Sequence, residues 1–345
     1  MKKEYLIEER PLKAMLVFAF PMLLGNLFQQ FYTMVDSVIV GQFVGENALA
    51  AVGASYSLTN VFISIAIGGG VGASVLTSRY FGARDYRRMK ESVYTALSAF
   101  FAVSVLLGGV GLLFSRQIMV ALNTPDNILS DATTYLDIYF IGLPFLFMYN
   151  VLSSMFNALG RSQIPLALLI FSSLFNVGMD LYMVCVLEMG VAGAAWATLI
   201  AQGISAVAAF VIFLRQMRGY KAEGQVSVFD LRTFREMCRI ALPSILQQST
   251  VSIGMMLVQS VVNSFGSEML AGYSAGSRIE SIAVVPMSAM GNVMSSYTAQ
   301  NLGAGRQGRV VTGYHTAFGI LAAFAAGICV ILVPFGQPIF GLFLG

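Results

Sequence analysis

The chain has 345 residues, of which 57% are hydrophobic and only 11% are charged. Soluble domains carry about 25% charged residues, so this composition excludes a soluble globular protein. Long apolar runs, bounded by charged residues, glycine or proline, predict an all-α polytopic membrane protein. The three cysteines show no metal-binding or disulfide spacing. The net charge of +3 matters less than the position of the charges.

In chain order, the apolar runs predict nine membrane-spanning helices, with a further one starting at residue 335. Basic residues collect on the cytoplasmic side of membrane proteins. With a cytoplasmic N-terminus, every lysine and arginine except Arg116 and Arg278 meets this rule. We therefore expect a multi-pass protein of the cell membrane. The predicted spans are Met15–Val40, Leu49–Ser74, Val93–Leu113, Tyr135–Phe156, Ile164–Leu187, Val191–Leu214, Ile240–Phe265, Leu270–Thr298 and Val310–Val333.

The sequence repeats after 221 residues. This displacement places Gly82 on Gly303 and Thr95 on Thr316, among other matches. An even number of predicted spans separates the copies, so both enter the membrane from the same side. Two parallel copies predict two helical bundles that rock against each other, as in many transporters.

The repeat also predicts the domain organisation. We expect an N-terminal six-helix bundle at residues 1–216 and a cytoplasmic linker at 217–238. An incomplete C-terminal bundle of about three helices, out of an expected six, occupies 239–345. This deficit suggests a fragment or a truncated protein. The linker is no more basic than a cytoplasmic loop should be, so it predicts no nucleic-acid partner.

Asp36 is the first polar residue that needs an explanation, because it interrupts the first apolar run. A carboxylate at the centre of a membrane helix costs about 2.5–3.5 kcal/mol on insertion scales, and such residues mark ion or proton paths. Asn176 and Asp180 lie four residues apart on one face of the fifth span, and Thr198 interrupts the sixth. These four oxygen-bearing side chains suit a proton or Na⁺ and no soft metal.

Other polar residues in the spans are weaker candidates. Tyr135 and Asp137 lie at the start of the fourth span, near its outer end. Arg278 and Glu280 are two residues apart, so they point in different directions and each needs its own partner. We treat this last pair as candidates for gating.

No pattern indicates an enzyme. The chain has one histidine, no phosphate loop and no nucleophile elbow. It also lacks the paired aspartate-rich loops that would hold magnesium pyrophosphate. We therefore expect neither catalytic residues nor a cofactor.

Several stretches resemble the multidrug and toxic compound extrusion (MATE) family of transporters. They include FPMLLGNLFQQFYTMVDSVIVGQFVGENALAAVG, RYFGARD, NALGRSQIPL, NVGMDLYMV, AGYSAGSRIE and AQNLGAGR, and they follow the family order along almost the whole chain. The resemblance implies two helical bundles facing each other across a central cavity. The tenth to twelfth helices of the family have no counterpart in this chain.

The resemblance also implies roles for particular residues. Asp36, Asn176, Asp180 and Thr198 match the cation site of the family, and the seventh helix lacks the glutamate that one branch carries. Pro21 matches the proline where the first helix bends. The candidates for the cavity or substrate site are Tyr135, Asp137, Gln30 and Met34.

The resulting hypothesis is a monomeric secondary exporter in the lipid bilayer, which exchanges amphipathic, often cationic, drugs for H⁺ or Na⁺. Cation binding at Asp36 and Asp180 would neutralise the site, bend the first helix near Pro21 and expel the drug. Three alternatives stay open: a lipid-linked oligosaccharide flippase of the same superfamily, a membrane enzyme and an inactive fragment.

Overall fold

The computed structural model of the chain describes residues 4–122, 124–222, 224–263 and 267–344. Within these ranges the protein is helical and has no β-strand, so the predicted all-α fold is confirmed. The elements are α1 (Tyr5–Glu8), α2 (Pro11–Ile39), η1 (Val40–Val44), α3 (Glu46–Gly82), α4 (Tyr86–Ala121), α5 (Asp126–Ala158), α6 (Gln163–Asp180), η2 (Leu181–Val186), α7 (Gly190–Arg218), α8 (Leu231–Asn263), α9 (Ser267–Gly303) and α10 (Gln307–Leu344).

Each predicted span corresponds to one long helix that begins before its apolar run, and in the first and fifth spans a short π-helical segment continues the helix. For example, α4 begins at Tyr86 because its first turns are amphipathic: Arg87 and Arg88 are exposed while Met89 is buried. Asp85 caps this helix by accepting a hydrogen bond from the Arg88 N–H. The prediction of a further helix starting at residue 335 is wrong, since α10 continues to Leu344. The equivalent residues of the first copy likewise form the last turns of α4.

Among the described residues, seven helices are long and apolar enough to cross a membrane. They are α2 with η1, α3, α4, α5, α6 with η2, α7 and α10. The helices α8 and α9 are similarly long but more polar, with stretches such as LRTFREMCR and QQST in α8. The chain is therefore a polytopic membrane protein whose eighth and ninth helices are its most polar.

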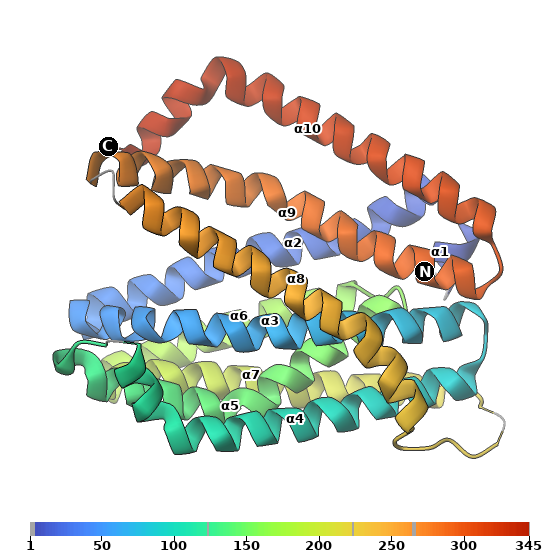
Figure 1. The fold of residues 1–345 in the computed structure, drawn as a ribbon, viewed down its shortest axis with the longest axis horizontal. Coiled ribbons are helices and arrows are strands. Elements are labelled where there is room, and N and C mark those ends of the chain that lie inside the picture. The colour runs from blue at the N-terminus through green and yellow to red at the C-terminus, as the bar shows by residue number, and fades with distance from the viewer. Residues whose placement is uncertain (1–3, 123, 223, 264–266, 345) are drawn as a thin grey trace.

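The centre of the molecule is α3, which contacts α4 and α5 as well as α8 and α9 (Figure 1). The helix bounds follow the 221-residue repeat: α9 starts and ends at the positions that correspond to the ends of α3. The last residues of these helices cross tightly. A Cβ atom on Gly82 would strike the Gln300 carbonyl, and one on Gly303 would strike the Arg79 carbonyl. Since Arg79 and Gln300 are also one repeat apart, the contact is symmetric.

The end of the molecule that carries α1 is closed by packing and hydrogen bonds. Met15 and Phe18 of α2 are fully buried in an apolar cluster with Tyr297 of α9. Arg309 donates from Nη2 to the Glu9 carbonyl at 2.6 Å and from Nε to Asn301 Oδ1 at 3.0 Å. These contacts fix α1 and the start of α2 against the turn between α9 and α10.

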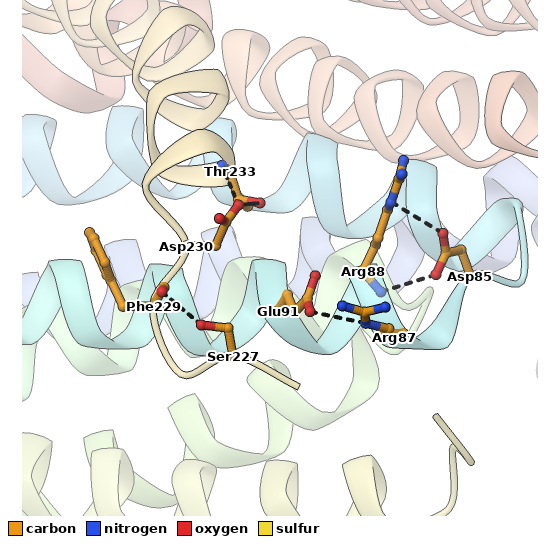
Figure 2. A network of polar contacts seen from close by, with 8 residues as sticks. All are labelled: Asp85, Arg87, Arg88, Glu91, Ser227, Phe229, Asp230 and Thr233. Atoms are coloured by element: carbon orange, nitrogen blue, oxygen red, sulfur yellow. Dashed lines mark hydrogen bonds and ion pairs between the residues drawn. The ribbon is translucent and has the colours of Figure 1, made fainter. Parts of the chain in front are cut away.

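The segment between α7 and α8 packs along α4, as Figure 2 shows. The Asp230 N–H donates to Thr95 Oγ1 of α4 at 3.0 Å. The Asp230 carboxylate then caps α8, accepting from the Thr233 N–H at 2.8 Å and from its hydroxyl at 2.6 Å. The irregular segment is therefore shorter than the predicted linker, because α8 already begins at Leu231.

Candidate functional site

Polar side chains from three helices, α2, α6 and α7, come together at one place in the molecule. On α2, Tyr32 and Asp36 lie four residues apart, which places them on one helix face. On α6, Asn176 and Asp180 have the same spacing and are 1% and 0% exposed. Thr198 reaches the same region from α7 and anchors its hydroxyl on the Ala194 carbonyl at 3.1 Å. The structure thus gathers the four side chains predicted for cation binding.

The carboxamide of Asn176 connects these helices. With its nitrogen facing acceptors, it donates to Asp180 Oδ2 at 2.9 Å and to the Tyr32 hydroxyl at 2.7 Å. Its oxygen then accepts from the Thr198 N–H at 3.0 Å. The opposite orientation leaves a 3.4 Å contact to Thr198 Oγ1. The hydrogen-bonding network decides amide orientation, so we adopt the first.

The two carboxyl groups face each other. Asp36 and Asp180 lie within hydrogen-bond contact, and Tyr135 of α5 lies beside both. The second oxygen of each carboxyl group, Oδ1, is buried and has no hydrogen-bond partner in the described part of the chain. Carboxylates this close repel each other unless a cation or proton lies with them. The structure therefore places two facing carboxyl groups beside polar side chains, with one oxygen of each left without a partner among the described residues.

A change of helix type follows each of the two carboxylates. The π-helical segment η1 begins four residues after Asp36, and η2 begins immediately after Asp180. The two segments contact each other, and Val40 and Val184 are buried together in one apolar cluster. Short π-helical segments occur frequently at functional sites. Here they form the apolar cover on the side of the carboxylate pair away from α1.

The remaining predicted residues lie outside this cluster. Asp137 has a buried Oδ1 without a hydrogen-bond partner among the described residues, and no contact joins it to the carboxylate pair there. Gln30 and Met34 are exposed on α2, and Pro21 is buried inside α2, which continues through it without a break. The two candidates for gating remain predictions: Glu280 is exposed on α9, and the Arg278 side chain lies outside the described residues.

Tyr32 belongs to the cluster, although the sequence analysis did not propose it. Its position four residues before Asp36 was the available signal, since this spacing places both on one face. A tyrosine in an apolar run is usually a packing residue or a membrane-interface residue, so composition gave no reason to select it.

In the described part of the second copy, the position equivalent to Asp36 carries no acid. The positions of α8 that correspond to Asp36 are Leu257 or Val258, which are 64% and 49% exposed. In the described part of the chain, no three His, Cys, Asp or Glu side chains are grouped as metal ligands. Among the described residues, the facing acids therefore lie in the first copy.

Known proteins share this sequence and fold. The MatE family model matches residues 21–182 and 243–345. The chain belongs to the MATE family. The "Probable multidrug resistance protein YpnP" of Bacillus subtilis is 30% identical over 96% of this chain and 74% of its own length. The "Multidrug export protein MepA" of Staphylococcus aureus is 23% identical over 99% of this chain and 76% of its own length.

The fold of this MATE chain also matches solved structures. "Crystal structure of MATE in the bent conformation" superposes with a TM-score of 0.91 at 24% identity, covering 99% of this chain and 77% of the other. MATE proteins are membrane transporters, and the named relatives are multidrug resistance and export proteins. The chain is therefore a multi-pass membrane protein of a family of efflux transporters.

Proposed function

We propose that this protein exports amphipathic, often cationic, small molecules in exchange for H⁺ or Na⁺ that enters down its gradient. The facing carboxyl groups of Asp36 and Asp180 carry the proposal, because each has a buried oxygen without a hydrogen-bond partner in the described part of the chain, and two facing acids need a cation. Relatives named for multidrug export support the substrate class.

The chemistry of the site supports either ion. A proton placed between Asp36 and Asp180 turns the repulsion of two carboxylates into a hydrogen bond. A Na⁺ would use the same carboxylates together with neutral oxygens, and Thr198 and Tyr32 are the nearest donors of this type. Asn176 holds Tyr32 and Asp180 in place, so the network responds as a unit when the cation leaves.

The transport cycle then follows from the position of the site between α2 and α6. When the cation binds, α2 moves closer to α6 and bends near Pro21, and the drug loses its space and leaves outward. Tyr135, Gln30 and Met34 border the path that the drug would take. The rocking of two bundles at residues 1–216 and 239–345 provides alternating access. In this account the protein is a monomer in the cell membrane with a cytoplasmic N-terminus, and it uses no cofactor.

Two alternative functions receive less support. A lipid-linked oligosaccharide flippase would need a more basic cavity than the side chains around Asp36 provide. An enzyme would need a nucleophile or metal cluster, and the family is one of transporters.

Gradient-driven export tests the proposal. Purified protein is reconstituted into proteoliposomes, and export of a fluorescent cationic dye is driven by a pH or Na⁺ gradient. We expect Asp36→Asn to lose the dependence on the gradient, because it can no longer exchange the cation. Asp131→Asn is the matched control, since that acid is exposed on α5 and belongs to no proposed site. Gradient-dependent export by Asp36→Asn at the wild-type rate would overturn the proposal.

A further inference from the structure

A small cavity lies beside the carboxylate cluster, on the side toward α1. It has a volume of about 60 Å³ and lies between α2, α6 and α7, with Tyr149 of α5 at its edge. Ser172 and Ser173 line it from α6, and Gln202 and Ser205 line it from α7. These positions continue the helix faces that carry Asp180 and Thr198, because each lies one or two turns further along the same face.

The lining of this cavity is polar and uncharged. Ser205 is 1% exposed, and its hydroxyl has no hydrogen-bond partner in the described part of the chain. Ser173 is 4% exposed. Buried polar groups are nearly always hydrogen-bonded, and water supplies the missing partner where a polar cavity has room for it.

The volume of the cavity limits what it can hold. One water needs roughly 10–15 Å³ of such space, whereas drug-sized ligands occupy clefts of about 300–1,000 Å³. A volume of about 60 Å³ therefore admits a few waters or a small hydrated cation and excludes a drug. The lining offers hydroxyl and carboxamide oxygens, which bind hard cations more weakly than carboxylates do.

The cavity shares lining residues with the cation cluster, and apolar core bounds it further along α7. Asn176 and Thr198 belong to both. In the other direction along α7, Ala209 and Phe213 are fully buried. The Phe213 ring packs edge-on against the Phe156 ring, with the two ring centroids 5.2 Å apart. In this conformation a cation could move from the carboxylates as far as Ser205, where the apolar core stops it.

We propose that this cavity is an inner station of the coupling site, which holds water and receives the coupling cation from Asp180 before the cation leaves toward the α1 end. The proposal rests on the ion-coupled export proposed above. It adds a location: the cation passes between α6 and α7, inside the first six helices, and its departure requires the apolar core at Phe213 to open.

Cysteine accessibility tests whether the cavity holds water. Cys185, Cys238 and Cys329 are first replaced by serine, and Ser205→Cys is then compared with Ala209→Cys, one turn further along the same face. The probe is aminoethyl methanethiosulfonate, a small water-soluble cation. Because thiol reactivity follows access, we expect Ser205→Cys to react at least about tenfold faster. Equal, slow reaction of both variants would overturn the inner station.

A second measurement tests the passage of the cation. Ser205→Leu fills the cavity, and Val207→Leu places the same side chain on the exposed face of α7 as the control. We expect Ser205→Leu to slow gradient-driven ion flux several-fold while equilibrium cation binding is kept, and Val207→Leu to keep both. If Ser205→Leu does not fold, Ser173→Val fills the same space from α6. Unchanged flux with the cavity filled would contradict the inference.

The two proposals fail in distinguishable ways. If Asp36→Asn keeps its gradient dependence, ion-coupled export at this site is wrong, whatever the cavity does. If Asp36→Asn loses coupling but Ser205→Cys is unreactive, the coupling site stands and only the inner station is wrong.

Discussion

The two copies of the repeat share their helix bounds but differ in chemistry. The helices α3 and α9 match end for end, and Gly82 and Gly303 make the same crossing from opposite sides. Only the first copy places an acid at this position of its first long helix, since α8 has Leu257 or Val258 where α2 has Asp36. The matching helix bounds are thus shared by both copies, while the facing acids lie in the first. In the proposed mechanism, cation binding acts on the first half, and the second half provides a surface for it to move against.

The largest expected effect is a loss of export when one of the two facing acids is removed. Asp180→Asn removes one of the two facing carboxylates, so the network no longer gains from binding a cation. Since allosteric coupling is typically worth 5- to 150-fold, we expect gradient-driven export to fall by roughly tenfold or more. Adding an acid to the second copy by Leu257→Asp should not restore it. Recovery of export in the double variant would show that the two copies are interchangeable.

The next largest effect is a loss of thermal stability when the symmetric crossing of α3 and α9 is overpacked. A methyl group on Gly82 or Gly303 strikes a backbone carbonyl of the other helix, and overpacking costs typically about 1–3 kcal/mol. We expect Gly82→Ala and Gly303→Ala to lower the Tm in detergent by similar amounts.

Gly109→Ala serves as the control for these two variants, because open space surrounds that position of α4. It should leave the Tm unchanged or raise it slightly, as alanine favours helix over glycine. Clearly unequal losses for the two crossing glycines would contradict the symmetry.

A third comparison uses Arg309 and Arg88, which are one repeat apart. Arg309 fixes α1 through the Glu9 carbonyl, whereas Arg88 makes an exposed ion pair with Asp85 at 3.6 Å. Hydrogen bonds from charged groups contribute about 1.5–3 kcal/mol, while surface ion pairs contribute about 0–1 kcal/mol. Arg309→Ala should therefore increase proteolysis near the N-terminus, and Arg88→Ala should not. Similar protection in both variants would show that α1 is held by its apolar contacts alone.

The smallest effect concerns how the first long helix of each copy starts. Asp230 caps α8 with its carboxylate, but α2 starts with Pro11 and has no side-chain cap. Removing a cap costs about 1 kcal/mol, so Asp230→Ala should lower the Tm slightly. Glu9→Ala, at the equivalent position, loses an i,i+4 pair with Lys13 that is worth about 0.3–0.5 kcal/mol.

This cap also predicts a pH dependence. The Thr233 hydroxyl and N–H hold the pKa of Asp230 below its ordinary value by hydrogen-bonding to the carboxylate. A lowered pKa stabilises the fold above the unfolded pKa of about 3.9, and this contribution is lost as the pH falls through the folded pKa. The Tm difference between wild type and Asp230→Ala should therefore shrink at acid pH. A difference that stays constant would assign the effect to packing.

The sequence predicted the helices and the centre of the site, for physical reasons that also explain what it missed. Apolar runs mark the membrane core, but not the amphipathic turns that extend α4 back to Tyr86. The spacing of Asn176 and Asp180 predicted a shared face, because helix periodicity is local. Two features depend on how α2, α6 and α7 pack. They are the hydrogen bond from Asn176 to the Tyr32 hydroxyl and the position of Ser173 and Ser205 in the lining of one cavity. Local patterns do not contain that information.

The most direct test of the one-sided coupling site counts the ions that drug binding displaces. Saturating drug is added to detergent-solubilised protein in weakly buffered solution, and released H⁺ or Na⁺ is measured with a pH dye or a sodium electrode. Linkage between the two sites requires that drug binding and cation binding oppose each other. We expect release from the wild type and no release from Asp36→Asn, although that variant still binds the drug. The same release from Asp36→Asn as from the wild type would contradict this expectation.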